Sequence, residues 1–270
     1  MALTIGKAPF SRPPGGAFNF DIERAAPGGI LYLEDVPKRI RGVLAGETIV
    51  DTRRSKMLFE SGQFAQWYIP VADIRAGVLE PSGPPARDPL KGERLSYAIH
   101  VGDRLEADAA WGFSDSPAGA PPLAGLVAIA FDRLDAWFEE DEETKEHPRD
   151  PYHRFDCRRT SDHVEVRIGG QTVADTRRAV KLFETSAPPR FYIPREDVTA
   201  GALTPSDSPR TFCPYKGAAA YYTVSSGGTT VKDGAWMLPE PLGEAIAVLD
   251  HVSFWGEGTE VIVEGQPTPI

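Results

Sequence analysis

Long apolar segments and cysteines are scarce in this sequence. The longest apolar run covers nine residues, from Leu123 to Phe131, whereas a membrane-spanning helix needs roughly twenty. We therefore expect no membrane partner. The first sixteen residues lack the charged and apolar blocks of a secretion signal, and the 270 residues include only two cysteines. Both features predict a cytoplasmic protein.

Positive charge is also in deficit. The chain has 29 Lys and Arg against 39 Asp and Glu, a formal net charge of −10. The stretch from Glu139 to Glu146 (EEDEETKE) alone supplies six acidic residues against one lysine. Binding to a phosphate backbone is disfavoured by this balance, so we expect no nucleic-acid partner.

Familiar catalytic motifs are missing as well. The sequence contains no GxGxxG after a predicted strand, no GxxxxGK[ST], no HExxH, no GxSxG and no CxxC pair. Their absence argues against dinucleotide-binding folds, P-loop enzymes, common zinc proteases and ordinary hydrolases.

The overall composition, in contrast, is ordinary for a globular protein. Apolar residues make up 41% of the chain and charged residues 25%, so the chain can bury a hydrophobic core. Its length is about twice that of a usual domain, which favours two domains.

An internal repeat supports this division. The segment 46–82 matches 170–206 at an offset of 124, with 18 of 37 positions identical. Further on, PLKG…SYAI…DAAW matches PYKG…YYTV…DGAW at an offset of 125. We also align LDAW (134–137) with VSFW (252–255), which predicts about seven extra residues in the first copy, within SDSPAGAPPLAG. A period this long indicates whole domains rather than solenoid repeats.

The repeat sets the expected boundaries. We predict an N-terminal arm at 1–37, a first domain at 38–140, an acidic linker and strap at 141–161, and a second domain at 162–270. The strap is polar and punctuated by proline, which is typical of a linker. We expect the first domain to pack against the second as a structural partner.

Each domain is predicted to be all-β. VEVRI and QTVAD flank Gly169-Gly170, and YYTVSS and TTVKD flank Gly227-Gly228, two patterns typical of β-hairpins. We expect seven or eight short strands per domain, which favours a sandwich or rolled sheet. The helical candidates are 242–249 and its counterpart near 123–130.

The loop TFCPYKG is the first candidate site. Lys216 follows Cys213 by three residues, and a nearby ammonium group favours the reactive thiolate. The first copy reads ARDPLKG, so Asp88 stands in place of Cys213 and a thiol reaction is confined to the second domain. The alternative is that Cys213 is a small residue buried under a tight turn.

Two further candidates lie on predicted strands. In DTRR…LFE, paired arginines suit an anion and Glu184 suits a buried base, although charges on a hairpin more often form cross-strand pairs. A stacking pocket for a flat ligand could form from four aromatic residues with Asp233 as a polar anchor, although such residues are more often core; the four are Tyr192, Tyr215, Tyr222 and Trp236. The ligand-binding candidates are Arg177, Tyr192, Thr211, Tyr222, Asp233 and Trp236.

The strap offers a fourth candidate site. Within 17 residues it contains His147, Asp150, His153, Cys157 and His163. All are metal-ligand types, but their spacing matches no recognised zinc site, and we predict no metal. The alternative is that the strap docks onto a domain through hydrogen bonds.

The chain resembles a widespread bacterial domain of unknown function, number 427 in its series. The resemblance rests on the segments DTRR…LFE…FYIPREDV, TFCPYKG and DGAW taken together. This family is sometimes labelled nucleotidyltransferase-like. The resemblance covers the second copy almost completely and the first as a divergent match. It implies a β-tent-like fold, whose relatives often hold zinc through two cysteine pairs. This chain lacks those pairs, and it also lacks the glycine-serine motif and paired aspartates of nucleotidyltransferases.

The resemblance also implies a set of site residues. The family pattern maps onto Glu184, Thr211, Cys213, Lys216, Gly217, Asp233 and Trp236. In the first copy, Glu60, Lys91, Asp108 and Trp111 match the pattern, whereas Ala86 and Asp88 depart from it.

Two functions stay open at this point. In the first, the second domain binds a small anionic or planar metabolite, nucleotides included, with or without enzymatic turnover. Lys216 would hold the anionic group, and Cys213 or Glu184 would act as nucleophile or base. In the second, the protein is a non-catalytic interaction module. No cofactor is identified from the sequence.

Overall fold

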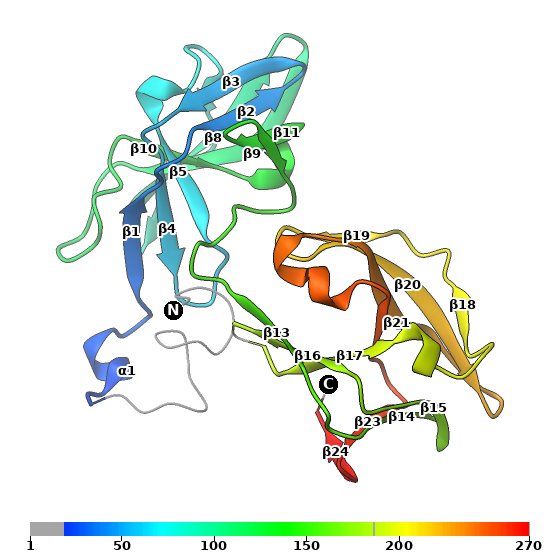
Figure 1. The fold of residues 1–270 in the computed structure, drawn as a ribbon. Coiled ribbons are helices and arrows are strands. Elements are labelled where there is room, and N and C mark those ends of the chain that lie inside the picture. Colours follow the sequence, from blue (N-terminus) through cyan, green and yellow to red (C-terminus); the bar gives the residue numbers. More distant parts are fainter. Residues whose placement is uncertain (1–18, 186, 270) are drawn as a thin grey trace. The chain divides into compact units, whose positions relative to one another are not determined.

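The computed structural model describes residues 19–185 and 187–269. The chain divides into two compact units, residues 1–152 and 153–270, each of which contains one copy of the repeat (Figure 1). The all-β class is confirmed, because no helix in the described part of the chain reaches seven residues. No described helix is both long and apolar enough to cross a membrane.

The first unit contains an eight-stranded and a four-stranded antiparallel sheet. The larger has the order β1-β4-β5-β10-β9-β8-β6, with β7 also paired to β8, and the smaller has the order β12-β11-β2-β3. The strands are β1 (Leu31–Asp35), β2 (Ile40–Leu44), β3 (Glu47–Thr52), β4 (Lys56–Glu60), β5 (Gln66–Pro70), β6 (Leu79–Pro81), β7 (Ala86–Asp88), β8 (Gly92–Val101), β9 (Arg104–Phe113), β10 (Leu126–Ile129), β11 (Ala136–Glu139) and β12 (Glu142–Thr144). The short helices are α1 (Ile22–Ala25), η1 (Val71–Asp73) and η2 (Phe131–Arg133).

The second unit repeats this arrangement. Its larger sheet has the order β13-β16-β17-β22-β21-β20-β18, with β19 also paired to β20, and its smaller sheet has the order β15-β14-β23-β24. The strands are β13 (Phe155–Arg159), β14 (Val164–Ile168), β15 (Gln171–Thr176), β16 (Val180–Glu184), β17 (Arg190–Pro194), β18 (Leu203–Pro205), β19 (Thr211–Cys213), β20 (Gly217–Ser226), β21 (Thr229–Pro241), β22 (His251–Phe254), β23 (Thr259–Val263) and β24 (Gln266–Thr268). Its short helices are η3 (Arg195–Asp197) and η4 (Gly243–Val248).

The two Gly-Gly hairpins are confirmed. Gly169 and Gly170 join β14 to β15, and Gly227 and Gly228 join β20 to β21. All four glycines have a positive φ, which glycine adopts without the strain that a side chain would bring.

The short helix expected within 242–249 is present as the 3-10 helix η4, but two other expectations are corrected by the strand pairing. The segment 123–130 contains strand β10 rather than a helix. Trp111 pairs with Ala128, and Trp236 pairs with Ser253. The offset therefore stays at 125 through this strand, so the first copy has no seven-residue insertion before β10.

The predicted arm and strap both contribute strands. β1, inside the predicted arm 1–37, pairs with β4. β12 and β13, inside the predicted strap 141–161, pair with β11 and β16. These segments lie in sheets because their backbone groups find partners there, and residues 1–18 of the arm lie outside the described residues.

Each unit buries its main hydrophobic core between its two sheets. In the second unit this core includes Val164 and Val166 from β14, together with Phe191, Ile193 and Phe254 from the larger sheet. A second apolar cluster covers the opposite face of the larger sheet and includes Leu182, Tyr192 and Leu238. Since side chains alternate along a strand, neighbouring residues of β17 belong to different clusters.

We predict that Gly217→Ala destabilises the protein more than Gly228→Ala. Both glycines have a positive φ, +98° and +83° respectively. A Cβ at Gly217 would lie 2.7 Å from the Glu240 carbonyl oxygen, whereas one at Gly228 meets no atom within 4 Å. Gly228→Ala serves as the control and should lose about 1 kcal/mol of unfolding free energy from backbone strain alone. Gly217→Ala should lose about 2–4 kcal/mol. Urea unfolding of the full chain measures both, and equal losses would contradict the steric argument.

Candidate functional site

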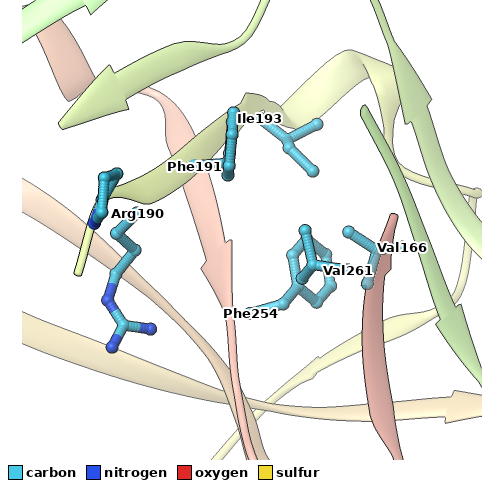
Figure 2. A pocket seen from close by; sticks show the side chains of 7 residues that line it. Val166, Arg190, Phe191, Ile193, Phe254 and Val261 are labelled. Atoms are coloured by element: carbon cyan, nitrogen blue, oxygen red, sulfur yellow. The ribbon is translucent and has the colours of Figure 1, made fainter. Parts of the chain in front are cut away.

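The candidate site lies on the face of the larger sheet that points away from the main core. Figure 2 shows the Arg190 guanidinium directed away from the apolar side chains of Phe191, Ile193 and Phe254. The space among those apolar groups is a cavity of about 10 Å³, which is at the lower limit for one water molecule. It is a packing gap, too small for an organic ligand.

A three-residue network occupies that face. The Lys216 Nζ donates a hydrogen bond to Glu184 Oε2 at 2.7 Å, and the His153 Nε2 lies 3.2 Å from Glu184 Oε1. Glu184 ends β16, Lys216 directly precedes β20, and His153 lies two residues before β13. The sheet therefore brings together three residues that are far apart in the sequence.

Burial and charge act in opposite directions on this network. Burial opposes the charge on Glu184, but the His153 hydrogen bond and the Lys216 charge hold its pKa below the usual range. Burial likewise opposes the charge on Lys216, but Glu184 outweighs it and raises the pKa of the lysine. At neutral pH the pair is ionised, and Glu184 is a weak base.

Aromatic side chains cover the network. The His153 ring stacks on Tyr215 with 4.4 Å between centroids, and the Lys216 Nζ lies 4.9 Å from the centre of the Phe155 ring. Tyr215 and Phe155 are buried. They exclude water from one side of the ion pair, which strengthens its electrostatic interaction.

A second group lies on the same face. The Trp236 Nε1 donates to the Tyr192 hydroxyl at 3.3 Å, and the Arg190 guanidinium carbon lies 4.8 Å from the centre of the Trp236 ring. Burial lowers the pKa of Arg190. Within 19–185 and 187–269, its Nη1 is buried without a hydrogen-bond partner. A buried guanidinium nitrogen without an acceptor is uncommon and calls for an explanation.

Cys213 borders this face. The thiol is free and half-buried, and it packs against the second apolar cluster. It is close enough to Lys216 to contribute to the raised pKa of the lysine. Cys157, the other free cysteine, lies 3.7 Å from the Glu244 carbonyl oxygen, and burial raises the pKa of its thiol.

Three of the predicted ligand-binding residues make their contacts elsewhere, whereas Thr211 lies on the same side of β19 as Cys213. The exposed Arg177 pairs with Glu264 at 3.5 Å. Thr211 hydrogen-bonds the Tyr221 hydroxyl at 2.7 Å, and Tyr222 packs on the main core with the Arg195 guanidinium over its ring. Asp233 has a φ of +54° and accepts a hydrogen bond from the Ser208 hydroxyl at 2.7 Å.

The DTRR segment makes the same structural contacts in both copies. The Thr176 hydroxyl donates to Asp197 at 2.6 Å and accepts from the Arg178 backbone N–H at 2.9 Å, while the Arg178 side chain pairs with Asp197. The corresponding residues of the first copy, Thr52, Arg54 and Asp73, form the same set. This motif joins β15 to η3 in the second copy and β3 to η1 in the first.

The strap residues do not form a metal cluster. No group of three or more His, Cys, Asp and Glu side chains suited to a metal occurs in the described part of the chain. His153 pairs with Glu184, and His163 with Asp175 at 2.9 Å.

Arg190 was not predicted as a site residue, and His153 was predicted either as a metal ligand or as one of the residues that dock the strap by hydrogen bonds, as it does on Glu184. Arg190 starts β17 two residues before Tyr192, so strand alternation places both on one face. That spacing was a usable signal. His153 had none, because its position depends on how β13 pairs with β16.

The first copy keeps the central ion pair with different surroundings. The Lys91 Nζ lies 2.7 Å from both oxygens of Glu60 and 3.2 Å from Asp88. The Trp111 Nε1 donates to the Tyr68 hydroxyl at 3.3 Å. The positions that correspond to His153, Phe155 and Tyr215 hold Gly29, Leu31 and Leu90, so the first copy has no aromatic cover there.

Comparison with known proteins agrees with the repeat. The family model of the domain of unknown function DUF427 matches residues 32–140 and 156–265. These two segments cover well over half of the chain and coincide with the two copies of the fold. A search of curated proteins finds no match.

We predict that Glu184→Gln costs about 3 kcal/mol of unfolding free energy at pH 7, because it leaves Lys216 buried beside a neutral amide. Because the pKa of Glu184 is lower in the folded than in the unfolded chain, its contribution is fully present above about pH 4.3 and is lost as the pH falls through the folded value. The deficit of Glu184→Gln should therefore shrink below about pH 4. Urea unfolding between pH 3.5 and pH 8 measures this.

Glu240→Gln is the matched control. Glu240 lies exposed on β21 of the same unit, so its loss should change stability by less than about 0.5 kcal/mol. The ion-pair argument would be contradicted if Glu184→Gln lost no more unfolding free energy than Glu240→Gln, or if its loss stayed constant down to pH 3.5.

Proposed function

The chain belongs to the DUF427 family in two tandem copies, and on this premise we propose that its second domain binds a small anionic or planar metabolite. The observation that carries this proposal is Arg190, whose buried Nη1 has no acceptor in the described part of the chain. A bound carboxylate or phosphate would supply that acceptor, and Arg suits such groups because its donors form a planar fork.

The charges and rings around Arg190 support the same class of ligand. Arg190 and Lys216 carry two positive charges against the one negative charge of Glu184, so an anion would neutralise the excess. Trp236 supplies an aromatic surface already stacked with Arg190, and a flat ligand group gains from contact with such a surface.

We assign binding rather than turnover to this site as its primary role. Glu184 accepts from two donors and has a lowered pKa, which makes it a weak general base. Any covalent reaction would fall to Cys213, beside Lys216. We place the activity in the cytoplasm, where free thiols such as Cys157 and Cys213 persist.

An interaction module is the second candidate function. Leu242, Ile246 and Leu249 lie in or next to η4 and are exposed, Ile246 by 58%. Three exposed apolar side chains within eight residues are a feature of surfaces that contact other proteins. This function predicts an unchanged melting temperature with every small ligand and a partner that binds through η4.

We predict that Arg190→Gln abolishes ligand binding by the second domain. Glutamine is a suitable replacement because Gln66 occupies the corresponding position of the first copy. A thermal-shift screen of nucleoside monophosphates and sugar phosphates identifies the ligand on the full chain. A ligand at a hundred times its dissociation constant adds about 2.7 kcal/mol of stability, a shift of several degrees. Arg190→Gln should remove that shift.

A compensating variant sharpens this test. In the first copy the guanidinium over the tryptophan comes from Arg94, and the corresponding residue of the second copy is Ala219. The double variant Arg190→Gln, Ala219→Arg should recover part of the shift. The exposed Arg158→Gln serves as a control and should bind like the wild type. A shift that survives Arg190→Gln, or no shift with any compound, would count against the proposal.

A further inference from the structure

The first copy contains a cleft of about 480 Å³ on the face that carries Lys91. This volume falls within the range of sites for small organic ligands, roughly 300–1,000 Å³. Leu58 and Phe113 form a buried apolar floor, and Phe64 forms a wall that is 58% exposed. The cleft therefore has room for a flat ring and an apolar surface to receive it.

The two carboxylates of the cleft are already engaged. Both oxygens of Glu60 face the Lys91 ammonium, and Asp88 accepts backbone N–H bonds from Leu90 and Lys91, each at 2.9 Å. Asp88 also lies 3.2 Å from the Lys91 Nζ. Neither carboxylate nor the lysine is left as the main recognition group for a ligand.

Two donors of the cleft stay unused. The Arg94 guanidinium lies 5.2 Å from the centre of the Trp111 ring and has no carboxylate partner in the ranges that the structure describes. The Tyr68 hydroxyl accepts from Trp111, and among the described residues its own proton has no acceptor. Burial raises the pKa of Tyr68 to about 12, so the proton stays in place at neutral pH.

The second copy differs at the positions that open this cleft. Arg190 stands where the first copy has Gln66, and its half-buried guanidinium lies over the tryptophan. In the first copy, Arg94 on β8 lies over the tryptophan instead, and its side chain is exposed. The arginine over the tryptophan therefore lies in the interior of the sheet face in the second copy and at its rim in the first. In the first copy the space above Tyr68 is left open.

We propose that this cleft is a separate ligand site that takes a small aromatic carboxylate, with its ring against Phe64 and Phe113 and its carboxylate on Arg94 and the Tyr68 hydroxyl. An aromatic ring matches the apolar floor and wall. A carboxylate matches the two unused donors, and the guanidinium binds it in a bidentate manner. This site is independent of the one proposed in the second domain.

Isothermal titration calorimetry of the full chain tests the proposal, with benzoate and 2-naphthoate as probes and benzamide as the neutral comparison. We expect one carboxylate molecule to bind per chain. Its binding should require Arg94. Arg94→Ala should weaken binding at least tenfold, Tyr68→Phe about three- to tenfold, and benzamide should bind at least tenfold more weakly than benzoate. Arg94 is exposed, so its replacement should leave the fold intact, which circular dichroism verifies.

Two controls separate this site from others. Arg53→Ala removes an exposed arginine of the same unit that pairs with Glu140 and should bind benzoate like the wild type. Arg190→Gln changes only the second copy and should also leave the benzoate affinity unchanged. The two proposed sites are therefore tested by different variants, and either proposal can fail without the other. Equal affinity in Arg94→Ala and wild type, equal affinity for benzamide, loss of binding in Arg190→Gln alone, or no saturable binding of either carboxylate would overturn the proposal.

Discussion

The larger sheet of each unit is apolar on both faces, and this constraint determines where a site can form. The smaller sheet covers one face and completes the main core. The other face receives only a second, smaller cluster, so ionisable residues at its border stay partly shielded from water. A lysine and a glutamate at such a border stabilise the fold only as a pair, since either one alone would be a buried charge without a partner.

Both copies contain this lysine–glutamate pair, but the residues around the pair differ. Lys216 lies under Phe155 and the stacked rings of His153 and Tyr215, whereas Lys91 binds a second carboxylate, Asp88. The first copy thus neutralises its lysine with charge, and the second shields it with aromatic rings. The same ion pair is a structural element in both copies, while the residues around it differ.

The sequence predicted the parts of this architecture that depend on local signals. Gly-Gly turns located the hairpins, and the repeated LFE and KG segments identified Glu184 and Lys216, which the structure brings within 2.7 Å. The correspondence between β10 of the first copy and β22 of the second was missed, because LDAW resembles VSFW in sequence while the sheets place 126–129 where the second copy has 251–254. Arg190 was missed although its spacing from Tyr192 on β17 places both on one face, whereas the role of His153 depends on how β13 pairs with β16. The arginines of DTRR looked functional, yet Arg178 is held by Asp197 of η3, a contact that needs the tertiary structure.

The position of one guanidinium distinguishes the two copies. Each copy places an arginine over its retained tryptophan, but from different strands: Arg94 from β8 and Arg190 from β17. The two side chains reach the ring from different directions, so the contact with tryptophan persists while the neighbouring volume changes. Two differences between the copies, at the positions of Gln66 and Arg190 and of Arg94 and Ala219, therefore change the space beside the tryptophan while an arginine stays over its ring. The replacement of Asp88 by Cys213 adds to this change, since it removes one negative charge from the second copy and leaves a surplus of positive charge there.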